Sequence, residues 1–148
     1  MHSSNFKYTF IILLSIIAFL FSSCDKENNE NEIPLAYVNF FINPNSTFYW
    51  RLNSPGGWEY VVADEPSRGI IIYRGLQDDF KAYERTCPYD PHEPAARVEV
   101  EPGDITLIDK CCNSRFLIID GSPVDGPSKR PLRQYRTTYD GNMLHVFN

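Results

Sequence analysis

Short apolar runs alternate with polar turn signals along residues 34–148, and no helical period of useful length appears. Residues 97–101 alternate charged residues with Val, which predicts a strand with one buried and one solvated face. Asp140-Gly141, between two alternating runs, indicates a β-hairpin. We expect strands at 36–42, 58–62, 69–73, 80–85, 97–101, 104–108, 116–119, 134–139 and 143–147. So many short strands predict an all-β fold, a small antiparallel sandwich or partly open barrel.

The stretch 45–55 is harder to interpret, because the aromatic residues Tyr49 and Trp50 stand beside Arg51 among polar neighbours. Packing in the core or at a sheet edge is the ordinary reason for such aromatic residues. A platform for a ligand is the alternative.

The first 23 residues form a separate segment, which we interpret as a signal peptide. Lys7 is its one formally charged side chain, residues 10–21 are almost wholly apolar, and Ser22-Ser23 precede Cys24. The apolar run is shorter than the roughly 20 residues that a membrane span needs. The residues before Cys24 resemble a bacterial lipobox, which implies a lipid on Cys24 and an outer-membrane anchor in the cell envelope, at the periplasmic face or the cell surface.

Residues 24–33 are polar and acidic, which predicts a flexible tether ahead of a single domain at 34–148. The tract also resembles the acidic tag that sends some lipoproteins to the cell surface, and this remains the alternative. The net charge of −5 leaves no basic surface for nucleic acid. Apart from the membrane, the expected partner is therefore an envelope protein or ligand that the sequence does not identify.

Three cysteines, Cys87, Cys111 and Cys112, remain for a compartment that is expected to be oxidising. Three thiols cannot all pair within one chain, so one is left over. A bond between the adjacent Cys111 and Cys112 would be strained. A bond from Cys87 to one of these two is more plausible, provided that the two loops meet.

Four segments occur in an order that resembles a Rieske domain, which carries Cys-x-His, Cys-x2-His-Gly-Ser-x-Phe, Gly-Pro and Pro-Leu-x-x-Tyr. The segments are Cys87-Pro88-Tyr89, Cys112-Asn113-Ser114-Arg115-Phe116, Gly126-Pro127 and Pro131-Leu132-Arg133-Gln134-Tyr135. The resemblance covers about residues 58–147. It implies a Rieske-like fold in which two opposed loops face each other.

By this resemblance, the four cluster-ligand positions fall on Cys87, Tyr89, Asp109 and Cys112. A Rieske [2Fe–2S] centre needs two thiolates and two imidazoles, and only His92 of the three histidines lies near these positions in the sequence. We therefore expect no cofactor, with an unusually ligated [2Fe–2S] cluster as the alternative.

The resemblance also implies a disulfide. The position of Cys112 points toward Cys87, whereas Cys111 falls on a non-ligand cysteine whose usual partner position is held by His92. We therefore expect a Cys87–Cys112 bond with Cys111 free. We expect no metal, although Cys87, His92, Asp109, Cys111 and Cys112 could together form a site of mixed sulfur, nitrogen and oxygen ligands.

No Cys-x-x-Cys motif indicates thiol–disulfide catalysis, and no Ser/His/Asp arrangement is evident. The sequence thus favours a lipid-anchored envelope protein with a non-enzymatic binding or assembly role. Two alternatives remain open: an electron-transfer protein with an unusually ligated cluster, and a thiol-redox or metal-binding lipoprotein.

Overall fold

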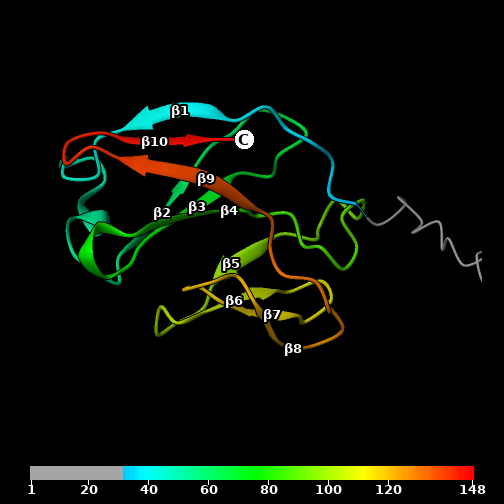
Figure 1. Cartoon of the computed structure of the whole chain (residues 1–148). Helices are drawn as coiled ribbons and strands as arrows, with labels where there is room; N and C mark the ends of the chain where they lie inside the picture. Colours follow the sequence, from blue (N-terminus) through cyan, green and yellow to red (C-terminus); the bar gives the residue numbers. More distant parts are fainter. Residues whose placement is uncertain (1–31) are drawn as a thin grey trace, which may run out of the picture.

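The computed structural model describes residues 32–148, which form ten strands and two short 3-10 turns (Figure 1). The strands are β1 (Asn39–Ile42), β2 (Trp58–Val61), β3 (Ile70–Arg74), β4 (Phe80–Glu84), β5 (Val98–Val100), β6 (Thr106–Asp109), β7 (Arg115–Leu117), β8 (Pro123–Asp125), β9 (Gln134–Tyr139) and β10 (Leu144–Phe147). The 3-10 turns are η2 (Trp50–Asn53) and η3 (Leu76–Asp78).

The strands build two antiparallel sheets. The larger has the order β1-β10-β9-β4-β3-β2, and the smaller has the order β5-β6-β7-β8. In Figure 1 the small sheet lies below the large one, and the chain passes from β4 into the small sheet and returns through β9. The β9–β10 hairpin closes at Asp140-Gly141, as predicted.

β3 is buried on both faces, so its side chains contribute to two separate hydrophobic clusters. Ile70 and Ile72 point into one cluster with Leu144 and Val146 of β10. Ile71 points into a second cluster with residues of the small sheet such as Phe116. An uninterrupted Ile-Ile-Ile run is typical of such a doubly buried strand. The second cluster fixes the small sheet, and hence its loops, against β3 and β4.

The predicted all-β fold is confirmed, and nine of the ten described strands overlap the predicted runs. β8 was not predicted, since Pro123-Val124-Asp125 resembles a turn in composition. It forms an edge of the small sheet, where a proline is tolerated because one side of the strand makes no ladder bonds. The N-terminal run also forms a shorter strand than expected, since residues 36–38 precede β1.

Residues 1–31 lie outside the described part, and with them the predicted signal peptide, Cys24 and most of the tether. Ile33 is already buried, and its carbonyl oxygen accepts a hydrogen bond from Arg133. The packed domain thus includes one residue before the predicted boundary at Pro34. Within residues 32–148, no helix has the length and apolarity to cross a membrane.

Candidate functional site

The loop from β6 to β7 is a tight turn that carries the second group of cysteines. Its ends are joined by two backbone hydrogen bonds, Asp109 N–H to the Ser114 carbonyl at 2.9 Å and Asn113 N–H to the Asp109 carbonyl at 2.8 Å. Asn113 has φ = 61°, a left-handed conformation that Asn adopts more readily than most residues. The turn thereby brings the side chains of Asp109, Cys112 and Ser114 together.

A second loop, after β8, presses on this turn. Gly126 has φ = 84°, and a Cβ atom built on it would lie 2.5 Å from the Cα of Ser114. Only glycine allows this approach. The Ser128 N–H then donates to Ser114 Oγ at 3.0 Å, so the serine hydroxyl is held in place from behind.

The opposing loop follows β4 and carries Cys87. The Thr86–Arg97 bridge closes its base, and the Cys87 N–H donates to the Ala96 carbonyl at 3.1 Å. Further along the loop, the Pro88 carbonyl accepts a hydrogen bond from Arg130. These backbone contacts hold Cys87 fully buried, facing the β6–β7 turn.

The two loops meet at the sulfur of Cys112, which lies 3.7 Å from Cys87 Sγ, 3.1 Å from Asp109 Oδ2 and 3.1 Å from Ser114 Oγ. Potential ligand atoms of Cys87, Asp109 and Cys112 all lie within 4.8 Å of one another. We call these three residues the thiol–carboxylate cluster.

Burial dominates the electrostatics of this cluster. Cys87 and Asp109 are 0% exposed. Burial raises the pKa of the Cys87 thiol well above its usual range, a backbone hydrogen bond from Tyr89 opposes this, and Asp109 raises the pKa further. Without a cation, the thiol of Cys87 therefore stays protonated at neutral pH.

Five residues were candidate metal ligands in the sequence. The structure places three of them close together, Cys87, Asp109 and Cys112. The other two, His92 and Cys111, are exposed and lie outside this group. Tyr89, at the position of the first Rieske histidine, is 48% exposed. The residues present do not fit a Rieske cluster, because the thiol–carboxylate cluster offers no imidazole and a Rieske centre needs two.

Cys87 and Cys112 are also the pair that was expected to form a disulfide. In the structure Cys87, Cys111 and Cys112 are free thiols. The separation of 3.7 Å between Cys87 Sγ and Cys112 Sγ is well beyond the roughly 2.05 Å of a disulfide. The fold brings the sulfurs of Cys87 and Cys112 close together, and the disulfide between them stays a prediction.

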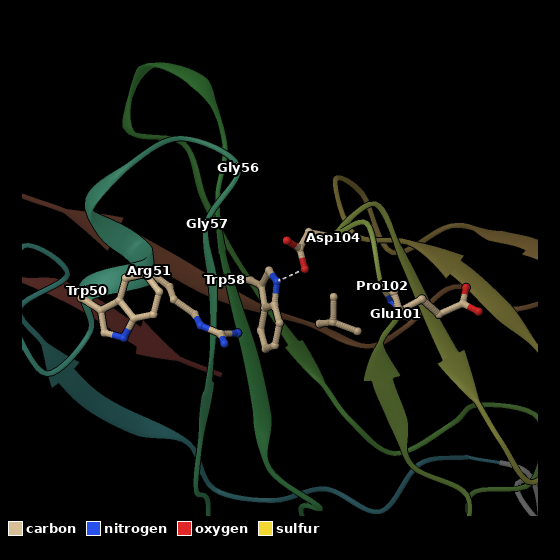
Figure 2. A pocket seen from close by; sticks show the side chains of 9 residues that line it. Trp50, Arg51, Gly56, Gly57, Trp58, Glu101, Pro102 and Asp104 are labelled. Atoms are coloured by element: carbon tan, nitrogen blue, oxygen red, sulfur yellow. Dashed lines mark hydrogen bonds between the residues drawn. The ribbon is translucent and has the colours of Figure 1, made fainter.

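A second candidate site is an open groove of about 580 Å³ between η2 and β2 on one side and the β5–β6 turn on the other (Figure 2). The Arg51 guanidinium lies between two indoles, 4.6 Å from the ring centre of Trp58 and 5.5 Å from that of Trp50. Trp58 Nε1 donates to Asp104 at 2.8 Å, and Glu101 adds a second carboxylate. Within the stretch 45–55, Tyr49 packs against the core as expected, whereas Trp50 is 64% exposed and reaches solvent in this groove.

The turn after η2 positions these groove residues. A Cβ atom on Gly57 would lie 1.6 Å from the Arg51 carbonyl oxygen, so only glycine fits. The turn also pairs with the end of β3, where the Arg74 N–H donates to the Gly57 carbonyl at 2.9 Å and the Gly56 N–H donates to the Arg74 carbonyl at 2.7 Å. The Arg74 side chain donates to the Leu52 carbonyl at 2.7 Å. Together these contacts fix Trp50 and Arg51 beside Trp58.

A buried carboxylate at Glu84, which is 1% exposed, was not predicted from the sequence. Its Oε1 accepts from the Arg68 N–H at 2.9 Å, the Thr86 N–H at 3.0 Å and the Thr86 hydroxyl at 2.8 Å. Its Oε2 accepts from the Tyr135 hydroxyl at 2.7 Å. In sequence, Glu84 resembles an ordinary charged residue at the end of a strand, and only the tertiary fold supplies its partners.

No protein-family model matches the sequence, and no curated protein matches it. Solved structures with a similar fold include a ferredoxin of carbazole 1,9a-dioxygenase from Nocardioides aromaticivorans IC177. It has 18% identity and a TM-score of 0.43, covering 64% of this chain and 86% of the ferredoxin. Another is described as the small subunit of an NADH-dependent nitrite reductase from Mycobacterium tuberculosis. It has 16% identity and a TM-score of 0.45, covering 76% and 96% of the two chains. The likeness to these solved structures is one of overall fold.

Proposed function

We propose that this chain is a lipid-anchored, non-enzymatic protein of the bacterial cell envelope, in which a Rieske-like domain without a [2Fe–2S] cluster serves as a binding module. One observation supports the proposal: Asp109 is buried and Tyr89 is exposed, and the sequence resemblance assigns these two residues to positions that hold a cysteine and a histidine in the Rieske pattern. Without imidazoles there is no means to bind the second iron, and the domain loses the redox chemistry of that pattern.

The groove of Trp50, Arg51 and Trp58 supports a binding role. Ligand sites combine aromatic surface with a few placed polar groups, and this groove joins two indoles to a guanidinium and the carboxylates of Glu101 and Asp104. A saccharide suits this chemistry, because its C–H faces pack on indole rings while its hydroxyl groups accept from Arg and donate to carboxylates. We therefore assign the groove to a saccharide.

Tryptophan fluorescence tests this assignment. The full chain is titrated with a panel of soluble oligosaccharides, and we expect at least one to change the emission saturably. Trp50→Ala should weaken that binding about tenfold or more, since alanine removes one stacking face. Phe48→Ala is the matched control, because Phe48 is also an exposed aromatic residue but does not line the groove. Unchanged emission across the panel, or equal binding by Trp50→Ala, would remove the saccharide assignment.

Iron and acid-labile sulfide, measured on protein purified without oxygen, test the loss of the cluster. We expect neither element in stoichiometric amount and no visible charge-transfer absorption. Stoichiometric iron and sulfide would instead establish the alternative, an electron-transfer protein with an unusually ligated cluster.

The anchor rests on Cys24 and the apolar segment before it. We expect the mature chain to begin at Cys24, to carry covalent lipid by intact mass and to partition with detergent. The Cys24→Ala variant should lose both the lipid mass and the membrane association. Processing at the same bond and membrane binding by the variant would contradict the lipid anchor.

A further inference from the structure

We propose that Cys87, Asp109 and Cys112 bind one divalent transition-metal ion, preferentially Zn²⁺, through two sulfurs and one carboxylate oxygen. This site replaces the cluster expected at these loops with a different ion and a different ligand set. The inference does not depend on the saccharide groove, which lies between other elements.

The spacing of the sulfurs is the first support. Two thiolates on a tetrahedral zinc ion, with Zn–S bonds of about 2.3 Å, lie about 3.8 Å apart. The observed separation of Cys87 Sγ and Cys112 Sγ is 3.7 Å. The carboxylate completes a compact triangle, because all three ligand atoms lie within 4.8 Å of one another. An ion can therefore contact all three without movement of the backbone.

The charge of Asp109 is the second support. Buried charges in proteins are paired or coordinate metals. Asp109 is 0% exposed, and among residues 32–148 it takes part in no ion pair. The Cys111 N–H occupies Oδ1 at 2.9 Å, whereas Oδ2 faces the Cys112 sulfur at 3.1 Å. A divalent cation beside Oδ2 supplies the missing positive charge.

The surroundings hold the ligands in place, as outer contacts do at protein metal sites. Asp109 is oriented by the Cys111 N–H. The β6–β7 turn that carries Cys112 is closed by its own backbone hydrogen bonds and is packed against Gly126. Ser114 Oγ, fixed by Ser128, lies 3.1 Å from Cys112 Sγ. The ligand set is thus rigid before the ion arrives.

The ligand types select the ion. Thiolates favour soft or borderline ions and a carboxylate favours harder ones, so a mixed set suits borderline Zn²⁺. Three protein ligands leave the fourth tetrahedral position for water, and the half-buried Cys112 provides access from solvent. Binding releases the two thiol protons to solvent, so two thiolates, one carboxylate and Zn²⁺ leave a net charge of −1. The metal also opposes oxidation of the thiols in an oxidising compartment.

The test uses the full chain, purified in detergent without oxygen and without chelators. Elemental analysis should find one Zn²⁺ per chain. Replacement by Co²⁺ should give thiolate-to-cobalt charge-transfer absorption and tetrahedral d–d bands. A thiol reagent should modify Cys111 at once, and the half-buried Cys112 only after a chelator is added.

Variants locate the site. Cys87→Ser and Cys112→Ser should each remove most of the charge-transfer intensity, and Asp109→Asn should weaken Co²⁺ affinity roughly 10- to 100-fold while keeping that intensity. Cys111→Ser is the matched control, since it removes a neighbouring exposed cysteine and should change neither readout. Circular dichroism of each variant verifies that it is folded.

Three results would overturn the proposal. One is a Cys87–Cys112 disulfide in freshly isolated, metal-free protein, seen by non-reducing peptide mapping. Another is iron with inorganic sulfide. The third is full Co²⁺ binding by the Cys87→Ser/Cys112→Ser double variant. An intact cluster would also contradict the proposed function, whereas a disulfide would contradict the zinc site alone, so the two failures are distinguishable.

Discussion

Glu84 and Asp109 are both buried carboxylates, but they differ in the hydrogen bonds that they accept. Glu84 accepts four hydrogen bonds from neutral donors at 2.7–3.0 Å. Asp109 accepts one backbone hydrogen bond at 2.9 Å and one from a thiol at 3.1 Å, a weak donor. The first group is satisfied by the fold. The second retains acceptor capacity, directed at two sulfurs.

The pKa of Glu84 shows how complete its environment is. Burial raises the pKa, but hydrogen bonds from Ser67, Tyr135 and the N–H groups of Arg68 and Thr86 outweigh burial and lower the pKa below its usual value of 4.5. A buried carboxylate in this protein is therefore a structural group when donors surround it. It is a candidate for chemistry when it faces thiols.

Glu84→Ala tests most directly whether the buried carboxylate of Glu84 stabilises the fold. The substitution leaves the donors of Arg68, Thr86 and Tyr135 without acceptors, at about 1–3 kcal/mol for each buried group that stays unsatisfied. We expect the free energy of unfolding to fall by about 3–5 kcal/mol, measured by urea denaturation. Glu84→Gln keeps one acceptor oxygen and should cost less. A loss below about 1 kcal/mol for Glu84→Ala would show that the network contributes little.

Gly126→Ala should disturb the β6–β7 turn beside Asp109 and leave the hydrogen bonds of Glu84 unchanged. The new methyl group would overlap Ser114, and alanine disfavours the positive φ of 84°. We expect a loss of about 2–4 kcal/mol in unfolding free energy, together with weaker Co²⁺ binding.

Gly141→Ala serves as the control for Gly126→Ala. Gly141 also has a positive φ, but no atom lies within 4 Å of its Cβ position. Only the backbone cost of about 1–2 kcal/mol should then appear. Equal losses for the two variants would mean that the contact with Ser114 is unimportant.

Tyr135→Phe removes one donor from Glu84 and leaves the core packing in place. Hydrogen bonds to charged groups contribute about 1.5–3 kcal/mol, and we expect a loss in that range at neutral pH. The lowered pKa of Glu84 contributes stability that is present above pH 4.5 and is lost as the pH falls through the folded-state value. The variant should therefore lose less stability on acidification than the wild type. Urea denaturation over a pH series measures this, and identical pH profiles would contradict it.

Asp109→Asn should have the smallest effect on stability in metal-free protein. The amide oxygen keeps the hydrogen bond from Cys111 and removes a buried charge, so we expect a change within about 1 kcal/mol, in the stabilising direction. The same denaturation assay measures it. A loss as large as that of Glu84→Ala would mean that Asp109 is a structural carboxylate too.

The strands and hairpin could be predicted because they follow from local alternation and turn residues. The run Ile70-Ile71-Ile72 and the Asp140-Gly141 turn each carry their signal within a few neighbouring residues. β8 could not be predicted in this way, since Pro123-Val124-Asp125 gains its strand character from pairing with β7.

The contacts at the candidate sites were likewise predicted in part. The meeting of Cys87 with Cys112 was predicted, since the resemblance to a Rieske domain supplied the long-range contact. The Trp58–Asp104 pair and the Tyr135–Glu84 hydrogen bond were not predicted, because they join residues 46 and 51 positions apart in the sequence. The pattern of apolar and polar residues along the sequence does not indicate such contacts.

The first described residues also show where the polypeptide enters the domain. Arg133 binds the carbonyl groups of Ile33 and Pro34, and its own carbonyl accepts from the Glu84 N–H, so the chain enters beside the end of β4 that leads to Cys87. The groove lies near the opposite ends of these strands, where the Gly57 carbonyl accepts from the Arg74 N–H. The polypeptide therefore enters the domain on the side of the thiol–carboxylate cluster, and the exposed ring of Trp50 lies at the other ends of the strands.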